Sequence, residues 1–398
     1  MNHKNYSQAV LSVKGSSIRE LFKMLSIPDF ISLAGGAPDP QAFPVEIIRK
    51  HISDILKFES KQVLQYGITG GYQSTIEALQ GYIYNTRGIK IEASRISITS
   101  GAQNAIDAVA KVFLDAGDVV ITESPTFLAA ITAFKLRGAK IVQVKMQSDG
   151  MDLIELESML KKHSPKLLYI IPNHQNPTGI STSSSKREHI VRLAQEHAVT
   201  IIEDDPYFEL SYSDNVPRIE TIYSMLPDST VYIGSMSKVI APGIRLGYTI
   251  SDELTKEKID IVRQVNEVHP VNISQKLVEK MIGTGEIYEI SERNRNLYRE
   301  KLDLAMDIIA TSFPEDVEYI TPTGGMFIWI TLPTRIKFRD LNQRLLEQKV
   351  GVVPGEGFYS DESTESNSFR INFTLVPKDK LEKGLRTIAS TLAGYSPS

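Results

Sequence analysis

The sequence predicts an α/β protein with a large domain built on a mostly parallel, seven-stranded sheet and a smaller α+β domain. Two observations lead to this fold class. Short β-branched runs recur through the middle of the chain, at residues 96–99, 119–122, 140–144, 167–172, 200–203, 230–233 and 246–250. Segments with helical spacing of apolar residues lie between several of these runs, and this alternation is typical of a parallel sheet covered on both faces.

Two of the intervening segments illustrate the helical pattern. Residues 105–113 follow the first run and the segment at 100–104, and they predict a helix. Ser185 and Glu188 have the spacing of a capping box, and the apolar positions of a second helix follow them.

The pattern changes near residue 280. Residues 286–309 contain neither proline nor glycine and predict one long connecting helix. The remainder mixes short strands with helices and predicts the smaller α+β domain. Its expected elements are strands at 317–320, 326–331, 350–353 and 369–375, a helix at 340–348 and a final helix.

Length supports the same division, because 398 residues suggest two domains, or three. We expect a large domain at residues 46–285 and a small C-terminal domain at 286–398. Residues 1–45 have no obvious place in the central sheet. They are expected to form an N-terminal arm that packs with the small domain or at a subunit interface.

Composition excludes several function classes. The chain has no cysteine, which excludes a disulfide framework, a cysteine nucleophile and a thiolate metal site, and no metal is expected. The net charge of −4, without basic blocks, does not suit a nucleic-acid partner. No apolar run approaches the ~20 residues of a membrane span, and the polar N-terminus shows no signal peptide. We therefore expect a cytoplasmic protein.

Polar segments follow several predicted strands, at the edge where parallel sheets bind ligands. Behind the run at 230–233 stand Ser235, Ser237, Lys238 and Arg245. Two hydroxyls and a guanidinium suit a phosphate, and cationic neighbours lower the pKa of a lysine and favour its neutral, nucleophilic form. The alternative is an ordinary surface lysine in a loop.

The segment from Ser100 to Asn104 follows the first strand and opens a helix. Small residues at a helix N-terminus present backbone N–H groups to an anion, and the helix dipole favours that anion. An ordinary strand–helix turn explains the segment equally well.

Asn176 and Asp204 stand at the ends of two further strands. Asn176 precedes a proline in a strong turn signal, and its amide could donate to a phenolate-like oxygen. Asp204 would be expensive to bury without a cation, and a protonated pyridine nitrogen is such a cation. A plain turn and a helix N-cap are the structural alternatives. Taken together, however, the residues at these strand ends meet the needs of one cofactor, pyridoxal 5′-phosphate (PLP).

With these residues the chain resembles the class I/II aminotransferases of PLP fold type I. It looks most like the subgroup of 2-aminoadipate, kynurenine and broad-specificity aromatic aminotransferases. The resemblance runs from about residue 16 to about residue 388. Its most specific segments are Asn176-Pro177-Thr178-Gly179, Asp204-Asp205-Pro206-Tyr207, and Ser235-Met236-Ser237-Lys238 with Pro242-Gly243-Ile244-Arg245.

The resemblance implies a role for each cofactor-facing residue. Lys238 would hold PLP as a Schiff base and later move the substrate Cα proton. Asp204 would pair with the pyridinium nitrogen, while Asn176 and Tyr207 would contact the phenolic oxygen. Phe127 would stack on the ring, at a position where relatives usually have tyrosine. The phosphate ligands would be the backbone of Gly101, Ala102 and Gln103, with the side chains of Ser235, Ser237 and Arg245.

The resemblance also implies substrate contacts and a dimer. Arg370 would bind the substrate α-carboxylate with help from Asn176 and the Gly36 backbone. Arg19 matches an arginine that reads a distal carboxylate in 2-aminoadipate relatives, although a first-turn surface position explains Arg19 nearly as well. Tyr66 matches a tyrosine that reaches the phosphate of the neighbouring subunit, so a homodimer with shared sites is expected.

The implied function is PLP-dependent transamination between an L-amino acid and 2-oxoglutarate by a ping-pong mechanism. The amino acid would be 2-aminoadipate, aromatic or branched-chain. A PLP-dependent β-lyase or decarboxylase on the same fold is the first alternative. A transcription regulator is the second, but a pattern that starts by about residue 16 leaves no room for a DNA-binding domain. A structural protein without cofactor is the third, and intact Lys238, Asp204 and Arg245 argue against it.

Overall fold

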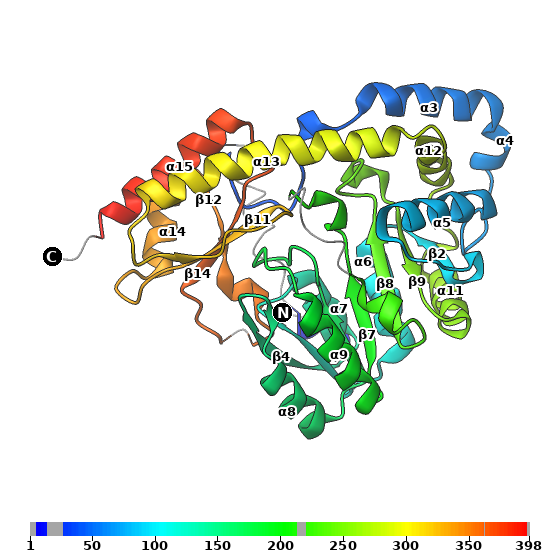
Figure 1. Ribbon diagram of the computed structural model, residues 1–398, viewed down its shortest axis with the longest axis horizontal. Helices are drawn as coiled ribbons and strands as arrows, with labels where there is room; N and C mark the ends of the chain where they lie inside the picture. Colours follow the sequence, from blue (N-terminus) through cyan, green and yellow to red (C-terminus); the bar gives the residue numbers. More distant parts are fainter. Residues whose placement is uncertain (1–4, 14–26, 213–219, 362, 396–398) are drawn as a thin grey trace.

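The computed structural model describes residues 5–13, 27–212, 220–361 and 363–395 (Figure 1). Its largest element is one sheet with the strand order β2-β9-β8-β7-β6-β3-β4-β5. The strands are β2 (Ile96–Thr99), β3 (Val119–Ser124), β4 (Lys140–Gln147), β5 (Gly150–Met151), β6 (Leu167–Ile170), β7 (Thr200–Asp204), β8 (Thr230–Ser235) and β9 (Gly247–Ile250). Neighbours from β4 to β8 are parallel, whereas β9 is antiparallel to both β8 and β2.

The predicted α/β class is confirmed, and the seven predicted strands are all present. The predicted count of seven is one too low, because β5 pairs with the end of β4 in a short antiparallel hairpin. Two residues are too few to produce a hydrophobic period, so β5 left no signal in the sequence.

Helices cover both faces of this sheet. Side chains alternate along a strand, so Leu167 and Tyr169 of β6 face one helical layer, and Leu168 and Ile170 face the other. The first layer contains α6 (Ala102–Phe113), α7 (Leu128–Leu136) and α11 (Glu253–Glu267). The second contains α5 (Gln73–Arg87), α8 (Leu153–His163), α9 (Ser184–Glu196), α10 (Ile222–Met225) and α12 (Asn272–Gly283).

The capping box predicted at Ser185 and Glu188 is wrong. Helix α9 starts two residues earlier than this prediction, with Ser183 as its N-cap, so both residues lie inside the first turns. Several serines precede this helix, and spacing alone does not show which of them has extended backbone angles.

A smaller antiparallel sheet follows, with the order β10-β11-β14-β13. Its elements are β10 (Glu318–Tyr319), β11 (Phe327–Thr331), β13 (Val353–Pro354) and β14 (Ser368–Asn372), with helices α14 (Phe338–Glu347) and α15 (Lys378–Ala393). The long helix α13 (Glu286–Ser312) runs from α12 to α15 and spans both sheets (Figure 1). The single strand predicted at 350–353 is wrong, since β12 (Val350–Gly351) and β13 belong to different sheets.

The N-terminal segment packs beside the smaller sheet. Strand β1 (Ile31–Ser32) pairs in parallel with β12. The buried Lys301 ammonium of α13 donates to Asp39 Oδ2 at 2.5 Å and to the carbonyl oxygens of Thr374 at 2.9 Å and Val376 at 2.7 Å. Asn372 also donates to the Gly35 carbonyl oxygen at 2.5 Å. These bonds join residues 35–39 to the end of β14 and to the residues that follow it. Domain boundaries at residues 45 and 285 stay a prediction.

The remaining elements are mostly short, although one fourteen-residue helix among them packs against α12. They are α1 (Gln8–Leu11), α3 (Val45–Phe58), α4 (Ser60–Val63), and the 3-10 turns η1 (Pro40–Ala42), η2 (Ala93–Arg95), η3 (Phe208–Leu210), η4 (Pro242–Ile244) and η5 (Gly355–Phe358). Within the described ranges, no helix combines the length and the apolar composition that crossing a membrane requires.

Candidate active site

The sequence-predicted residues gather at the C-terminal edge of the large sheet. Asp204 ends β7, Ser235 ends β8, and Lys238 follows three residues later. Asn176 lies beyond the end of β6, and Phe127 beyond the end of β3. Parallel strands bring their carboxyl ends to one edge, so the topology assembles side chains that are far apart in the sequence.

Asp204 is a buried carboxylate with one oxygen left open. Its side chain is 2% exposed, and the Tyr169 hydroxyl donates to Oδ2 at 2.6 Å. Among the residues that the structure describes, Oδ1 has no hydrogen-bond partner. Burial raises the pKa of Asp204 to about 7, against the lowering effect of the Tyr169 hydrogen bond. A carboxylate placed in this way is stabilised by a cation that also donates a hydrogen bond to Oδ1.

The neighbouring Asp205 is excluded from this role. Its two oxygens accept hydrogen bonds from the Asn173 amide at 2.9 Å and the Tyr232 hydroxyl at 2.8 Å. Successive strand residues point to opposite faces, so Asp205 faces a buried polar network and Asp204 faces the site.

An anion cradle forms where β2 runs into α6. Gly101 has φ +87°, and a Cβ there would lie 2.5 Å from Arg245 Nη2. Arg245 Nη2 donates to the Ser100 carbonyl oxygen at 2.9 Å, so the guanidinium lies against this loop. Helix α6 starts at Ala102 with no side-chain cap, and its first N–H groups have no intrahelical acceptor. Positive charge and open donors therefore meet at one point.

Two serines lie at the end of β8, where Ser235 is the last strand residue and Ser237 follows two residues later. Ser235 and Ser237 are buried, and the Ser235 hydroxyl accepts from the Ser237 backbone N–H at 3.2 Å. Gln103, another predicted contact, has an exposed side chain whose amide donates to the Ala129 carbonyl oxygen at 3.2 Å. Its side chain therefore faces α7, and only its backbone N–H belongs to the start of α6.

Lys238 is partly buried, and its ammonium donates to the Gly36 carbonyl oxygen at 2.6 Å. Burial lowers the pKa of Lys238 to about 8, and the positive charges of Arg370 and Arg245 act in the same direction. At neutral pH this lysine therefore has a larger neutral fraction than an exposed lysine, which favours its action as a nucleophile.

Arg370 of β14 is held between two aromatic rings. The guanidinium carbon lies 4.1 Å from the Phe327 ring centroid and 5.1 Å from that of Phe358. Nη1 donates to Asn176 Oδ1 at 2.7 Å, and Nη2 donates to the Ala34 carbonyl oxygen at 2.8 Å. Burial lowers the pKa of Arg370 to about 10, which still leaves it charged at neutral pH. A planar, fixed guanidinium suits bidentate recognition of a carboxylate.

Tyr207 completes this group. It is buried, and its ring meets Phe327 edge-to-face with centroids 5.8 Å apart. Burial raises the pKa of Tyr207, and the Arg370 charge and the Asn176 hydrogen bond act against this rise. The hydroxyl is therefore a neutral donor beside the amide of Asn176.

Tyr66 lies apart from this cluster. It is 79% exposed, with its ring edge-to-face against His269. Arg19 lies outside the described residues. Phe127 is half-buried at the N-cap of α7, beside the buried core.

The structure also reveals residues that sequence reasoning missed. Tyr169 bonds Asp204, and Phe327 and Phe358 enclose Arg370. The buried Glu123 accepts from the Gln175 amide at 2.9 Å and so joins the end of β3 to the loop after β6. All of these residues stand in apolar or turn segments of the sequence. A polar group within an apolar strand run was the one available signal for Tyr169.

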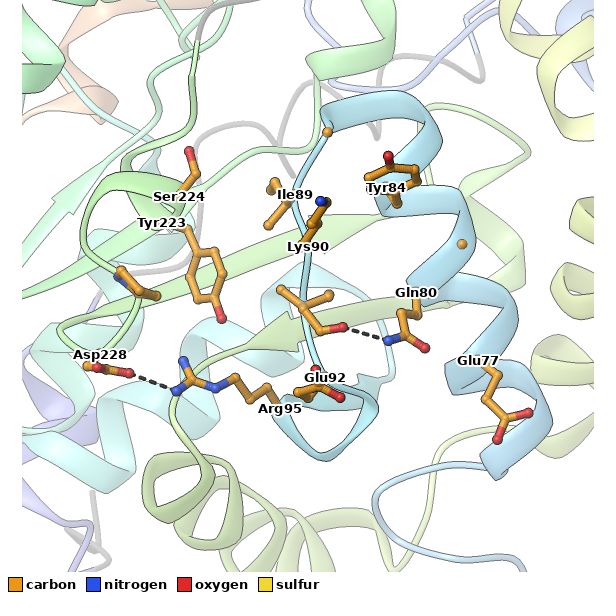
Figure 2. A pocket seen from close by; sticks show the side chains of 14 residues that line it. Glu77, Gln80, Tyr84, Ile89, Lys90, Glu92, Arg95, Tyr223, Ser224 and Asp228 are labelled. Atoms are coloured by element: carbon orange, nitrogen blue, oxygen red, sulfur yellow. Dashed lines mark hydrogen bonds and ion pairs between the residues drawn. The ribbon is translucent and has the colours of Figure 1, made fainter.

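A pocket away from this site lies between α5 and the segment around α10 (Figure 2). None of the sequence-predicted site residues lines it. Its walls bear both charges, among them Lys90, Glu92, Arg95 and Asp228, and Arg95 Nη2 donates to Asp228 Oδ1 at 2.9 Å. In the part of the chain that the structure describes, no three histidine, aspartate or glutamate side chains are grouped to hold a metal.

Comparison with known proteins decides the family. Residues 28–388 match the family model for aminotransferase class I and II. The chain belongs to this family. This aminotransferase is 34% identical, over 395 residues, to aromatic-amino-acid aminotransferase 1 of Thermococcus litoralis, and the match covers 98% of this chain and 94% of the relative.

Solved structures agree with this assignment. Kynurenine aminotransferase of Pyrococcus horikoshii, in complex with PMP, superimposes with a TM-score of 0.93 at 33% identity, covering 99% of this aminotransferase and 98% of the other chain. The α-aminoadipate aminotransferase LysN of Thermus thermophilus, complexed with N-(5′-phosphopyridoxyl)-L-leucine, gives 0.90 at 32% identity, covering 98% and 97%. The predicted family, fold type and PLP-dependent aminotransferase class are thereby confirmed.

The geometry fits the PLP cofactor of this family on three counts. The open oxygen of buried Asp204 suits a protonated ring nitrogen. The start of α6, with Arg245 against Gly101, suits a phosphate. Lys238 offers an amine whose pKa is lowered toward neutrality.

Proposed function

We propose that this aminotransferase moves an amino group from an L-amino acid to 2-oxoglutarate by a ping-pong mechanism. The observation that carries the proposal is Arg370, a guanidinium fixed between two rings and bonded to Asn176. An amino-acid carboxylate placed on it would have a rigid, desolvated partner. The relatives named for aromatic, kynurenine and α-aminoadipate activities support 2-aminoadipate, aromatic or branched-chain donors.

The bound cofactor supplies an electron sink for the electron pair of the substrate Cα–H bond. Lys238 would hold the aldehyde carbon of the cofactor, and its Nζ would take the substrate Cα proton. Asp204 would hold the proton at the ring nitrogen through Oδ1. Tyr207 and Asn176 would donate to the phenolic oxygen. Arg370, Asn176 and the Gly36 backbone would bind the substrate, and Phe127 would pack on the cofactor ring.

The phosphate is assigned to the cradle after β2 and to the segment after β8. Its proposed ligands are the backbone of Gly101, Ala102 and Gln103 and the side chains of Ser235, Ser237 and Arg245. The exposed ring of Tyr66 is proposed to complete this site in a second copy of the chain. A homodimer with shared sites is therefore part of the proposal.

A half-reaction tests the class of chemistry. Adding L-glutamate alone to the yellow enzyme should convert all of its cofactor to the amine form and release one equivalent of 2-oxoglutarate. The reason is that a ping-pong enzyme completes one half of its cycle without the second substrate. A β-lyase or decarboxylase would instead turn over its amino acid with the absorbance of the aldehyde form retained, and that result would contradict the proposal.

A donor panel with 2-oxoglutarate as acceptor tests the substrate class. We expect 2-aminoadipate, an aromatic amino acid or leucine to give the highest kcat/KM. Arg19→Ala should lower kcat/KM for 2-aminoadipate about tenfold more than for leucine, since only the former has a distal carboxylate to bind. Equal losses for the two donors would remove Arg19 from the substrate site.

Lys238 should lose its proton at a lower pH than the exposed lysines do. In the cofactor-free enzyme, acetylation of Lys238 by acetic anhydride should rise with pH to a midpoint near 8, because burial and two cationic neighbours disfavour the ammonium form. Exposed lysines in the same digest should keep rising toward pH ~10.4 and serve as the internal reference. Arg370→Gln removes one of the cations and should move the Lys238 midpoint upward. If acetylation of Lys238 followed the same pH dependence as that of the exposed lysines, the lowered pKa assigned to Lys238 would be refuted.

A further inference from the structure

We infer that Tyr169 is a positioning residue for the cofactor ring: its hydroxyl fixes Asp204 by one oxygen, so that the other faces the ring nitrogen. This inference rests on the proposed role of Asp204. It adds a residue that touches neither substrate nor cofactor and acts only through the carboxylate.

The register of the sheet brings the two residues together. Strands β6 and β7 are parallel, and Tyr169 is level with Ile202. Asp204 lies two residues beyond Ile202 on β7, about 6.6 Å from it along the strand, and its side chain points to the same face. A tyrosine side chain is long enough to span that step, and its hydroxyl reaches Asp204 Oδ2 at 2.6 Å.

The tyrosine itself has one fixed position. Its ring is completely buried and packs edge-to-face on Phe134 of α7, with centroids 5.6 Å apart. Burial, reinforced by the Asp204 charge, raises the pKa of Tyr169 well above its ordinary value. The hydroxyl is therefore a neutral donor at neutral pH.

The carboxylate depends on this contact for its orientation. Tyr169 holds Oδ2, and Oδ1 has no other partner among the described residues. Without the hydroxyl, both oxygens of Asp204 would be buried and open, and the carboxylate could rotate about its terminal bond. The hydrogen bond also stabilises the ionised form, which keeps the shared proton on the ring nitrogen.

Tyr169→Phe tests the inference because it removes only the hydroxyl and leaves the ring on Phe134. The measurement is the dissociation constant of pyridoxamine phosphate from the cofactor-free enzyme, which avoids bond formation with Lys238. The same measurement is made with the carbocyclic analogue, in which C–H replaces the ring nitrogen. The ratio of the two constants isolates the nitrogen's contribution to binding.

We expect Tyr169→Phe to weaken pyridoxamine phosphate about tenfold and to leave the analogue unchanged. Unchanged analogue binding also shows that the variant pocket is folded. Tyr82→Phe is the matched control, since that buried hydroxyl also donates to a carboxylate, Glu209, at 2.5 Å. It should change neither constant.

Two results would overturn the inference: equal weakening of both ligands, or no weakening of either. Asp204→Asn separates these failures from a failure of the proposed function. If Asp204→Asn removes the nitrogen's contribution and Tyr169→Phe does not, only the inference is lost. If Asp204→Asn also leaves the ratio unchanged, the proposed role of Asp204 is lost with it.

Discussion

Replacing Lys238 by alanine should lower the transamination rate by at least about 10⁴-fold while the fold survives. The variant loses both the amine that binds the cofactor aldehyde and the base that moves the Cα proton. Steady-state assays with glutamate and 2-oxoglutarate give the rate, and borohydride reduction followed by mass spectrometry shows whether cofactor is still trapped on the chain. Turnover close to that of the parent enzyme would end the proposed mechanism.

The control for this variant is Lys186→Ala. Lys186 is also largely buried, but its ammonium bonds Gln147, Gly150 and Met151 within the β4–β5 hairpin. Its loss should lower the melting temperature and leave kcat near that of the parent. Lys238→Ala should instead raise the melting temperature of the cofactor-free enzyme. The folded-state pKa of Lys238 is lowered to about 8, so burying its ammonium opposes folding below pH 8, and that cost disappears between pH 8 and the unfolded value near 10.4.

Asp204→Ala is expected to have the second largest effect, a loss of about 10³-fold in kcat. Without the carboxylate the ring nitrogen loses the partner that keeps it protonated, and the cofactor becomes a poor electron sink. The rate of the glutamate half-reaction, followed by absorbance in a stopped-flow instrument, measures this directly. Half-reaction rates near those of the parent would refute the role.

Asp205→Asn provides the comparison at the adjacent position. Asp205 is equally buried, but Asn173 and Tyr232 occupy its oxygens. We expect this variant to lose stability, because a charged acceptor in a buried network becomes a neutral amide, and to keep most of its half-reaction rate. Losses in the opposite order would mean that the two aspartates have been assigned the wrong way round.

Much of the fold could be predicted because its signals are local. Each long strand of the large sheet is a continuous apolar run, and the chain between runs has helical spacing, so class and strand positions follow from short windows. The prediction of a single strand at 350–353 was wrong because local signals do not specify which strands pair. Val350 pairs with Ile31 and Val353 with Arg370, and these partners are more than 300 residues and 17 residues away respectively. Nothing within the run itself shows that it changes sheet.

Some residues of the candidate site could also be predicted from local signals, and others could not. Lys238, Asp204 and Asn176 could be proposed because polar residues at strand ends converge in any parallel sheet. Tyr169 could not, because its contact depends on the register of β6 against β7, which a single sequence does not specify. The rings around Arg370 come from β11 and from η5, and only tertiary packing brings them together. Tyr66 faces outward in a single chain, so its predicted role depends on a second copy.

The bonds around Lys301 and Asn372 make one mechanical unit of two distant parts of the chain. Residues 35–39 contain the Gly36 carbonyl that accepts from Lys238, and β14 contains Arg370. Any movement of the smaller sheet would therefore displace the Arg370 guanidinium and the Gly36 carbonyl oxygen together. Lys238 follows a strand of the large sheet, so its ammonium would lose the hydrogen bond to Gly36.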